Sequence, residues 1–198
     1  MEAESRFTQP RPDCPHPERW HSPDSDSTEI EVSRLVAAFV EALRPDLVIE
    51  TGTAFGQTAE LIGDALGAVA NTWLITFETD AQRAEHARQR CIATRVDVRE
   101  EPSLVGIQSL IDGGMAGKVG FAWLDSLFEL RIPELRLIRP LLSAGAIVGI
   151  HDCGEPGATK YNDFSRKVAL EAHRLGFKRL SLPTPRGVTF LQMERGFA

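Results

Sequence analysis

The chain has 198 residues, of which 42% are hydrophobic, so it can bury one sizeable core and a single domain is expected. Its formal net charge of −6 argues against nucleic acid as a partner, because nucleic-acid backbones are held by dense Lys and Arg patches, and favours a small molecule. Three cysteines without paired spacing, and no apolar run near the roughly 20 residues that span a bilayer, favour a cytoplasmic location without membrane contact.

The first 26 residues contain five prolines among polar and charged residues, a composition that disfavours both helix and sheet. We interpret residues 1–26 as a flexible arm, either disordered or folded over a ligand site as a lid, and residues 27–198 as the single domain. Cys14, His16 and His21 lie in this arm, but three candidates without a second cluster are poor support for a metal site.

A helix is predicted to begin at Thr28. Apolar residues recur three and four positions apart from Val32 to Leu43, and Thr28 with Glu31 matches a capping box. Pro45 is expected to end this helix.

Strands and helices then alternate. Short apolar runs predict strands at residues 47–49, 73–77, 96–98, 119–124 and 146–150. The segments between them predict helices at residues 59–66, 81–92, 104–111 and 135–142. Such alternation implies right-handed crossovers and a mostly parallel sheet, so the predicted class is α/β, doubly wound.

The C-terminal part departs from this alternation. A helix ending at Gly176 is followed by two strand-like runs, 177–182 and 187–193, whose short link P-T-P-R-G forces an antiparallel hairpin. A dehydrogenase-type dinucleotide fold would continue with another crossover. Five parallel strands closed by a hairpin resemble the class I S-adenosylmethionine-dependent methyltransferases over residues 28–198. The resemblance implies a Rossmann-like, seven-stranded sheet.

A glycine-rich loop follows the first of these strands. The strand ends in Glu50, and Gly52 and Gly56 before the next helix allow a sharp turn and a close approach to a ligand. The simpler alternative is a tight strand-to-helix turn that binds nothing.

The sequence of this loop, E-T-G-T-A-F-G, resembles the first motif of the methyltransferase superfamily, E-x-G-x-G-x-G, with Ala54 in place of the middle glycine. It is similar to a branch of O-methyltransferases that act on small natural products. The resemblance implies S-adenosylmethionine as cofactor, with Glu50, Gly52, Thr53 and Gly56 in its site. Glu50 and the amides around Gly52 and Thr53 would face the methionine end.

Two acidic residues extend the expected cofactor site. Glu78 ends the second strand, 22 residues after Gly56, where a carboxylate can accept hydrogen bonds from both ribose hydroxyls. Asp80 is more simply the N-cap of the next helix. Glu101 follows the third strand, where members of the resembled family contact the adenine, and a solvated acidic turn is its alternative.

Three further polar residues end the fourth and fifth strands. Asp125 ends W-L-D and His151 and Asp152 end V-G-I-H-D, so all three are expected at the carboxyl edge of the sheet, where open α/β sheets bind ligands. In cation-dependent O-methyltransferases, which the chain resembles, these positions hold a metal ion. Carboxylates suit Mg²⁺, whereas the imidazole of His151 shifts the preference toward Mn²⁺ or a similar ion.

Two alternatives stand beside this metal site. His151 could be a general base without metal, since its ordinary pKa near 6.5 lets it take a proton at neutral pH, with Asp125 and Asp152 as further catalytic residues beside the cofactor. Alternatively, His151 and Asp152 only hydrogen-bond the loop that follows.

The predicted function is methyl transfer from S-adenosylmethionine to a hydroxyl of a small metabolite, with or without a divalent cation. The alternative is a non-catalytic or NAD-type Rossmann-like binding protein. The sequence leaves open whether the chain forms a homodimer.

Overall fold

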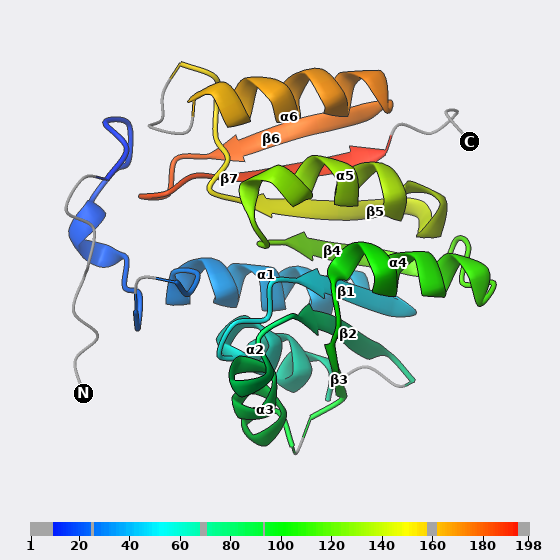
Figure 1. Ribbon diagram of the computed structural model, residues 1–198. Coiled ribbons are helices and arrows are strands. Elements are labelled where there is room, and N and C mark those ends of the chain that lie inside the picture. The colour runs from blue at the N-terminus through cyan, green and yellow to red at the C-terminus, as the bar shows by residue number, and fades with distance from the viewer. Residues whose placement is uncertain (1–9, 25, 68–70, 93, 158–161, 194–198) are drawn as a thin grey trace.

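A computed structural model describes residues 10–24, 26–67, 71–92, 94–157 and 162–193 (Figure 1). Seven strands form one sheet in the order β3-β2-β1-β4-β5-β7-β6. They are β1 (Leu47–Thr51), β2 (Trp73–Glu78), β3 (Val96–Glu100), β4 (Val119–Leu124), β5 (Leu142–His151), β6 (Phe177–Leu182) and β7 (Val188–Met193). The first five strands in this order, from β3 through β2, β1 and β4 to β5, pair in parallel. Strand β7 runs antiparallel to β5 and β6. The predicted doubly wound α/β fold with its C-terminal hairpin is confirmed.

Helices cover both faces of the sheet (Figure 1). They are α1 (Ile30–Leu43), α2 (Gln57–Leu66), α3 (Ala81–Arg90), α4 (Ser103–Asp112), α5 (Phe128–Ile138) and α6 (Asn162–Arg174), with short 3-10 turns η1 (Pro17–Arg19) and η2 (Arg139–Leu141). Successive side chains of β1 point to opposite faces: Val48 packs in the core beneath α1 and α2, and Ile49 in the core beneath α4, α5 and α6. Among the described residues, no helix combines the length and apolar character that a membrane crossing requires.

The start of α1 differs from the prediction. The helix begins at Ile30, and Thr28 and Glu31 form no capping box. Thr28 Oγ1 instead donates a hydrogen bond to Asp125 Oδ2 at 2.6 Å, and a Glu31 carboxylate oxygen accepts from the His21 backbone N–H at 2.9 Å. Thr28 and Glu31 therefore make tertiary contacts in place of the capping contacts that were predicted.

Helix α5 also differs, because it covers residues 128–138 rather than 135–142. Two of its buried side chains, Arg131 and Glu134, are charged, and they interrupt the apolar pattern by which a helix is found in a sequence. Glu134 is held by hydrogen bonds from three hydroxyls, including Thr51 Oγ1 at 3.0 Å. Residues 139–141 form the turn η2, and β5 already begins at Leu142.

The described part of the N-terminal segment lies beside the carboxyl ends of β4 and β5 (Figure 1). Arg11 is buried, and its backbone N–H donates to the carbonyl of Pro185 in the C-terminal hairpin at 3.0 Å. The carbonyl of His21 accepts from the Ile30 N–H at 2.8 Å, which joins the segment to α1. Residues 1–9 of the predicted arm lie outside the described residues, and the boundary between arm and domain stays a prediction.

Candidate functional site

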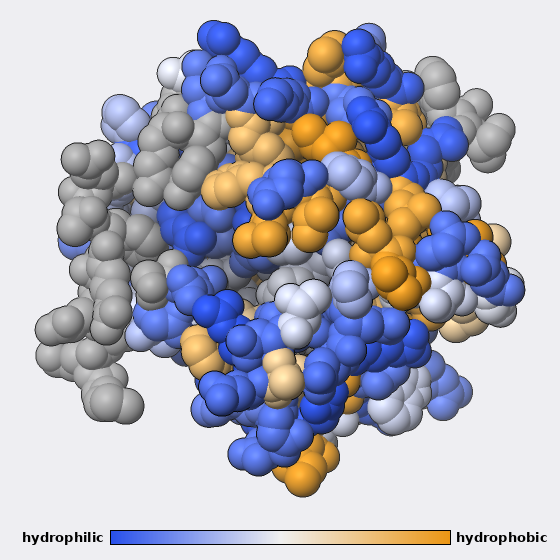
Figure 2. Space-filling model, in the orientation of Figure 1, coloured by the Kyte–Doolittle hydropathy of each residue, from blue (hydrophilic) through white to orange (hydrophobic). Residues whose placement is uncertain are grey.

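A pocket of about 570 Å³ opens at the carboxyl ends of the parallel strands, where the sequence had placed the ligand. The loop after β1, the end of β2 and the start of α4 line one part of it, and the ends of β4 and β5 with the start of α5 line the other. Figure 2 shows apolar surface gathered around α5 on this face and hydrophilic surface over α2 and α3. Leu127 and Phe128 contribute exposed apolar side chains to the pocket's rim.

Gly52 makes the close approach that the loop was expected to need. Its φ is +80°, and a Cβ added to it would lie 2.5 Å from the carbonyl oxygen of Asp125. The backbone N–H groups of Gly52 and Thr53 both donate to the carbonyl of Phe77, at 3.1 and 3.2 Å. These two amides therefore fix the loop to β2, and Gly52 contributes only its backbone surface to the pocket wall. Gly56, with φ +79°, starts α2 and packs against Ala87.

Glu50 lies beneath this loop and only 1% of its surface is exposed. It accepts a hydrogen bond from Thr76 Oγ1 at 2.6 Å, and the Thr76 hydroxyl also bonds the hydroxyl of Thr53. Burial raises the pKa of the Glu50 carboxyl to about 8, despite the Thr76 hydrogen bond, and the negative charges of Asp125 and Glu78 add to the rise. Glu50 and Thr53 line a small recess next to the main pocket rather than the pocket itself.

Glu78 borders the main pocket at the end of β2. Its carboxylate accepts from the backbone N–H groups of Ala54 at 2.9 Å, Thr79 at 2.8 Å and Asp80 at 3.0 Å. The carboxylate is therefore held in one place by three amides, next to the loop that carries Gly52. Glu101 lies on the same part of the pocket wall, as predicted from its position after β3.

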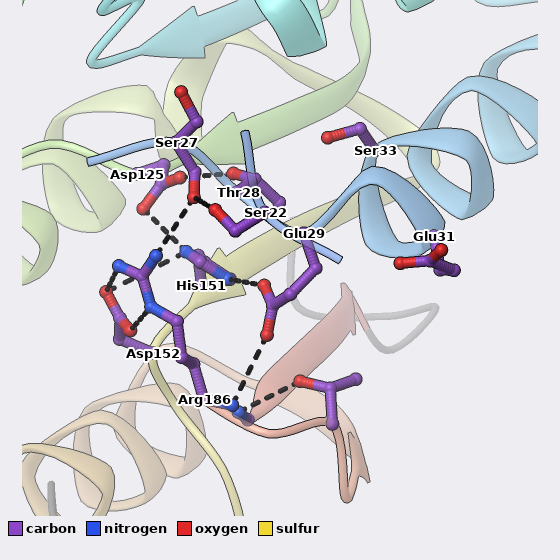
Figure 3. Close-up of polar contacts among 12 residues, drawn as sticks. Ser22, Ser27, Thr28, Glu29, Glu31, Ser33, Asp125, His151, Asp152 and Arg186 are labelled. Atoms are coloured by element: carbon purple, nitrogen blue, oxygen red, sulfur yellow. Dashed lines mark hydrogen bonds and ion pairs between the residues drawn. The ribbon is translucent and has the colours of Figure 1, made fainter. Parts of the chain in front are cut away.

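His151 lies behind the other part of the pocket and is fully buried (Figure 3). Its Nδ1 lies 3.0 Å from Asp125 Oδ1 and its Nε2 lies 2.6 Å from Glu29 Oε2, so a carboxylate flanks each ring nitrogen. Burial alone would lower the pKa of His151, but the negative charges of Asp125, Asp152 and Glu29 outweigh it and raise the pKa to about 10. The imidazole is thus a cation at neutral pH. The arrangement disfavours His151 as general base, because a buried ring with both nitrogens engaged has no free lone pair with which to accept a proton, and that role stays a prediction.

Two arginines complete the cluster around His151. Arg131 of α5 donates through Nη2 to Asp125 Oδ1 at 3.0 Å and to Asp152 Oδ2 at 3.3 Å. Arg186, in the turn before β7, donates to both carboxylate oxygens of Asp152, at 2.7 and 3.1 Å. Burial alone would raise the pKa of Asp125, but His151, Arg131 and Arg186 together hold it well below its usual range.

The structure does bring Asp125, His151 and Asp152 together, as the strand-end argument predicted, with one ligand atom of each within 4.8 Å of the others. The donor set nevertheless does not fit a divalent cation. Both His151 nitrogens face carboxylates, Asp125 Oδ2 accepts from Thr28, and guanidinium N–H groups engage the carboxylate oxygens of Asp152. Metal ligands need free lone pairs, whereas both nitrogens of His151 are engaged and Asp125 Oδ1 and Asp152 Oδ2 each already face two N–H donors.

Sequence reasoning missed three of the charged residues in this cluster. Glu29 fell inside the helix predicted from Thr28, and it lies just before the observed α1. Arg131 lies in the first part of α5, which was not predicted to be helical, and Arg186 lies in the hairpin link. The hairpin pattern could have placed Arg186 at the site. A strand that runs antiparallel to β5 begins beside the carboxyl end of β5, so the turn that precedes it must lie at the carboxyl edge of the sheet.

The pattern for a family described as "Methyltransferase domain" matches residues 49–153. The chain resembles the solved structure of cofactor-bound Rv0187 from MTB, with a TM-score of 0.72, 16% identity and coverage of 86% of this chain and 83% of the other. It also resembles the O-methyltransferase from Bacillus cereus in complex with SAH (0.72, 14% identity, 86% and 84% covered). A third similar structure is the O-methyltransferase TomG from Streptomyces achromogenes, involved in tomaymycin synthesis, in complex with SAM (0.69, 16% identity, 85% and 82% covered). No curated protein matches the chain significantly.

Proposed function

This chain belongs to the class I S-adenosylmethionine-dependent methyltransferase family, and on that premise we propose that it transfers a methyl group to a hydroxyl of a small metabolite. The single observation that carries the proposal is the shape of the pocket. One wall is built by the glycine loop and Glu78, and a second, adjoining wall by the charged cluster and the apolar start of α5.

The residues present fit S-adenosylmethionine on the first wall. Gly52 lets the loop lie directly against the carbonyl of Asp125, so that no side chain projects into the pocket there. Among the described residues, the fixed carboxylate of Glu78 accepts only one backbone N–H at Oε2, which leaves that oxygen able to accept from a ribose hydroxyl. Glu101 lies where it can border the adenine. When bound, the cofactor supplies an electrophilic sulfonium methyl group.

The second wall fits a small acceptor with an apolar body and a hydroxyl. Phe128 and Leu127 offer apolar surface, and Arg186, whose side chain is 17% exposed, places a guanidinium paired with Asp152 at the same surface. A cation beside a hydroxyl stabilises its ionised form and so makes it a better nucleophile. The chain's own contribution is then to position the acceptor oxygen and to favour loss of its proton.

The test begins with calorimetric titration of the protein with S-adenosylmethionine. We expect one site per chain and no heat with NAD. In Glu78→Gln the dissociation constant should rise roughly tenfold or more, since one of the oxygens proposed to accept from the ribose becomes an amide donor. Glu85→Gln, an exposed acid on α3, is the matched control and should bind like the wild type.

The second stage supplies methyl-labelled S-adenosylmethionine with a panel of phenols and aliphatic alcohols. Label appearing on an acceptor oxygen supports the proposal. Binding of NAD in place of S-adenosylmethionine would contradict it in favour of a dinucleotide-binding protein. Tight cofactor binding without transfer to any hydroxyl or amine would instead indicate a non-catalytic binding module.

A further inference from the structure

We propose that Arg131 takes the place of a divalent cation, so that the chain binds no metal ion at Asp125, His151 and Asp152. The inference deepens the proposed function, because it concerns how the acceptor side of that same pocket is organised. It starts from the position of one atom: Nη2 of Arg131 lies between Asp125 Oδ1 and Asp152 Oδ2, at 3.0 and 3.3 Å. A cation bridging the two carboxylates would have to occupy that position.

The rest of the guanidinium is held by contacts that leave it little freedom to move aside. Nη1 donates to the carbonyl of His151 at 2.6 Å, and Nε donates to the carbonyl of Ser126 at 2.7 Å. The aromatic ring of Phe128 lies 4.6 Å from the guanidinium carbon, and only 4% of the Arg131 side chain is exposed. A metal ion would therefore have to break several buried hydrogen bonds to enter.

The charges lead to the same conclusion. Three carboxylates, those of the buried Glu29 and Asp152 and of the partly buried Asp125, face the guanidinium groups of Arg131 and Arg186 and the imidazole of His151. Arg186 binds both oxygens of Asp152, the bidentate geometry that makes such pairs strong. A divalent ion would add two positive charges to carboxylates that fixed cations already neutralise, and it would gain little in return.

The arrangement assigns Arg131 and Arg186 the role of positioning residues. Arg131 ties the end of β4 to the end of β5 by contacting Asp125 and Asp152 at once, and Arg186 ties the hairpin turn to the same point. Their positive charge is permanent and independent of metal supply, because arginine stays protonated under all ordinary conditions.

Titration with Mn²⁺, followed by the electron paramagnetic resonance signal of the free ion, tests this inference. The wild-type protein should leave the free-ion signal undiminished. Arg131→Ala removes the nitrogen between the two carboxylates, so it should bind Mn²⁺ roughly tenfold or more tighter than the wild type. Because loss of a buried cation can impair folding, Arg186→Gln is the second variant: its side chain is more exposed, it frees only Asp152, and it should show a smaller gain.

Arg136→Ala is the matched control, since Arg136 also lies on α5 and also pairs with a carboxylate, that of Glu171. It should gain no affinity. One equivalent of Mn²⁺ bound by the wild type and lost in Asp152→Asn would overturn the proposal, as would folded Arg131 and Arg186 variants without any gain. Failure to bind S-adenosylmethionine would refute only the proposed function, because the Mn²⁺ measurement needs no cofactor.

Discussion

At the scale of single residues, Glu50 makes the stability of the folded chain depend on pH. The carboxyl group is buried and its pKa is raised to about 8, so it stays protonated in the folded protein where an exposed glutamate would be ionised. In the unfolded chain its pKa returns to the ordinary value near 4.5. The Glu50 carboxyl therefore loses its proton at a lower pH in the unfolded chain than in the folded chain. Its contribution to the free energy of unfolding is fully present below pH 4.5 and is lost as the pH rises to 8.

Glu50→Gln should remove that pH dependence. Each pH unit in the window costs the wild type about 1.4 kcal/mol, whereas glutamine stays neutral and can still accept from Thr76. We expect the variant to exceed the wild type in free energy of unfolding by about 4 to 5 kcal/mol at pH 9 and by less than about 1 kcal/mol near pH 5. Urea unfolding at the two pH values measures the difference, and a difference that is the same at both would contradict the buried, protonated state of Glu50.

The sequence predicted which residues meet at the site better than it predicted their chemistry. The proximity of Asp125, His151 and Asp152 followed from the ends of adjacent parallel strands, a rule that needs no side-chain detail. The state of His151 depends on Glu29, which lies 122 positions earlier in the chain. Because no local pattern ties residues so far apart, the sequence offered no reason to choose between the metal and the general-base alternative.

At the scale of elements, the loop between β1 and α2 depends on the end of β4. Gly52→Ala would place a Cβ 2.5 Å from the Asp125 carbonyl oxygen and would keep an unfavourable φ of +80°. We expect lower thermal stability and a roughly tenfold or greater loss of S-adenosylmethionine affinity, because the loop must move away from the pocket wall. Thermal unfolding and calorimetric titration measure the two effects.

Gly117→Ala is the control for this loop. Gly117 has a similar φ of +70° in the turn before β4, but nothing lies within 4 Å of its added Cβ. It should carry the backbone strain of about 1 to 2 kcal/mol without the overlap and should leave cofactor affinity unchanged. Equal losses of affinity in both variants would show that the approach of Gly52 to β4 is unimportant for binding.

Helices and strands were predictable where their buried side chains are apolar, and were misplaced where ionisable side chains are buried. The five parallel strands appeared as apolar runs and the hairpin as two strand-like runs joined by a short link, and all seven strands are present. Helix α5 was misplaced because Arg131 and Glu134 lie on its buried face, and the α1 cap was wrong because Thr28 serves Asp125 instead. Both errors fall at the site, where polar side chains are buried for reasons other than local structure.

At the scale of the whole molecule, the N-terminal segment and the turn of the C-terminal hairpin meet beside the pocket. The backbone of Arg11 bonds Pro185, and the carbonyl of Ser27 accepts from Arg186 Nη1 at 3.0 Å. Glu29 and Thr28, which contact His151 and Asp125, come at the end of the same N-terminal segment. Docking of this segment against the hairpin therefore supports the cluster from outside.

Arg11 is the anchor of that docking. Its guanidinium binds the Asp13 carboxylate at 2.8 and 2.6 Å, and it fills the space beside Gly154 and Gly187, where neither residue has a side chain to exclude it. Nη1 of Arg11 finds no hydrogen-bond partner among the described residues, so its contribution comes from packing and from the Asp13 pair. Loss of the side chain should leave a void between the segment and the hairpin.

Arg11→Ala should therefore loosen the N-terminal segment before the rest of the fold. We expect the amides of Cys14 and Ile30, whose hydrogen bonds close the segment on itself and on α1, to exchange with deuterium roughly tenfold or more faster. The melting temperature should fall by about 2 to 4 °C for each kcal/mol lost. Arg19→Ala, at an exposed position in the same segment, should change neither quantity. Unchanged amide exchange at Cys14 and Ile30 in Arg11→Ala would mean that other contacts hold the segment. The strongest candidate among those contacts is the pair of Glu29 and His151, because both side chains are fully buried.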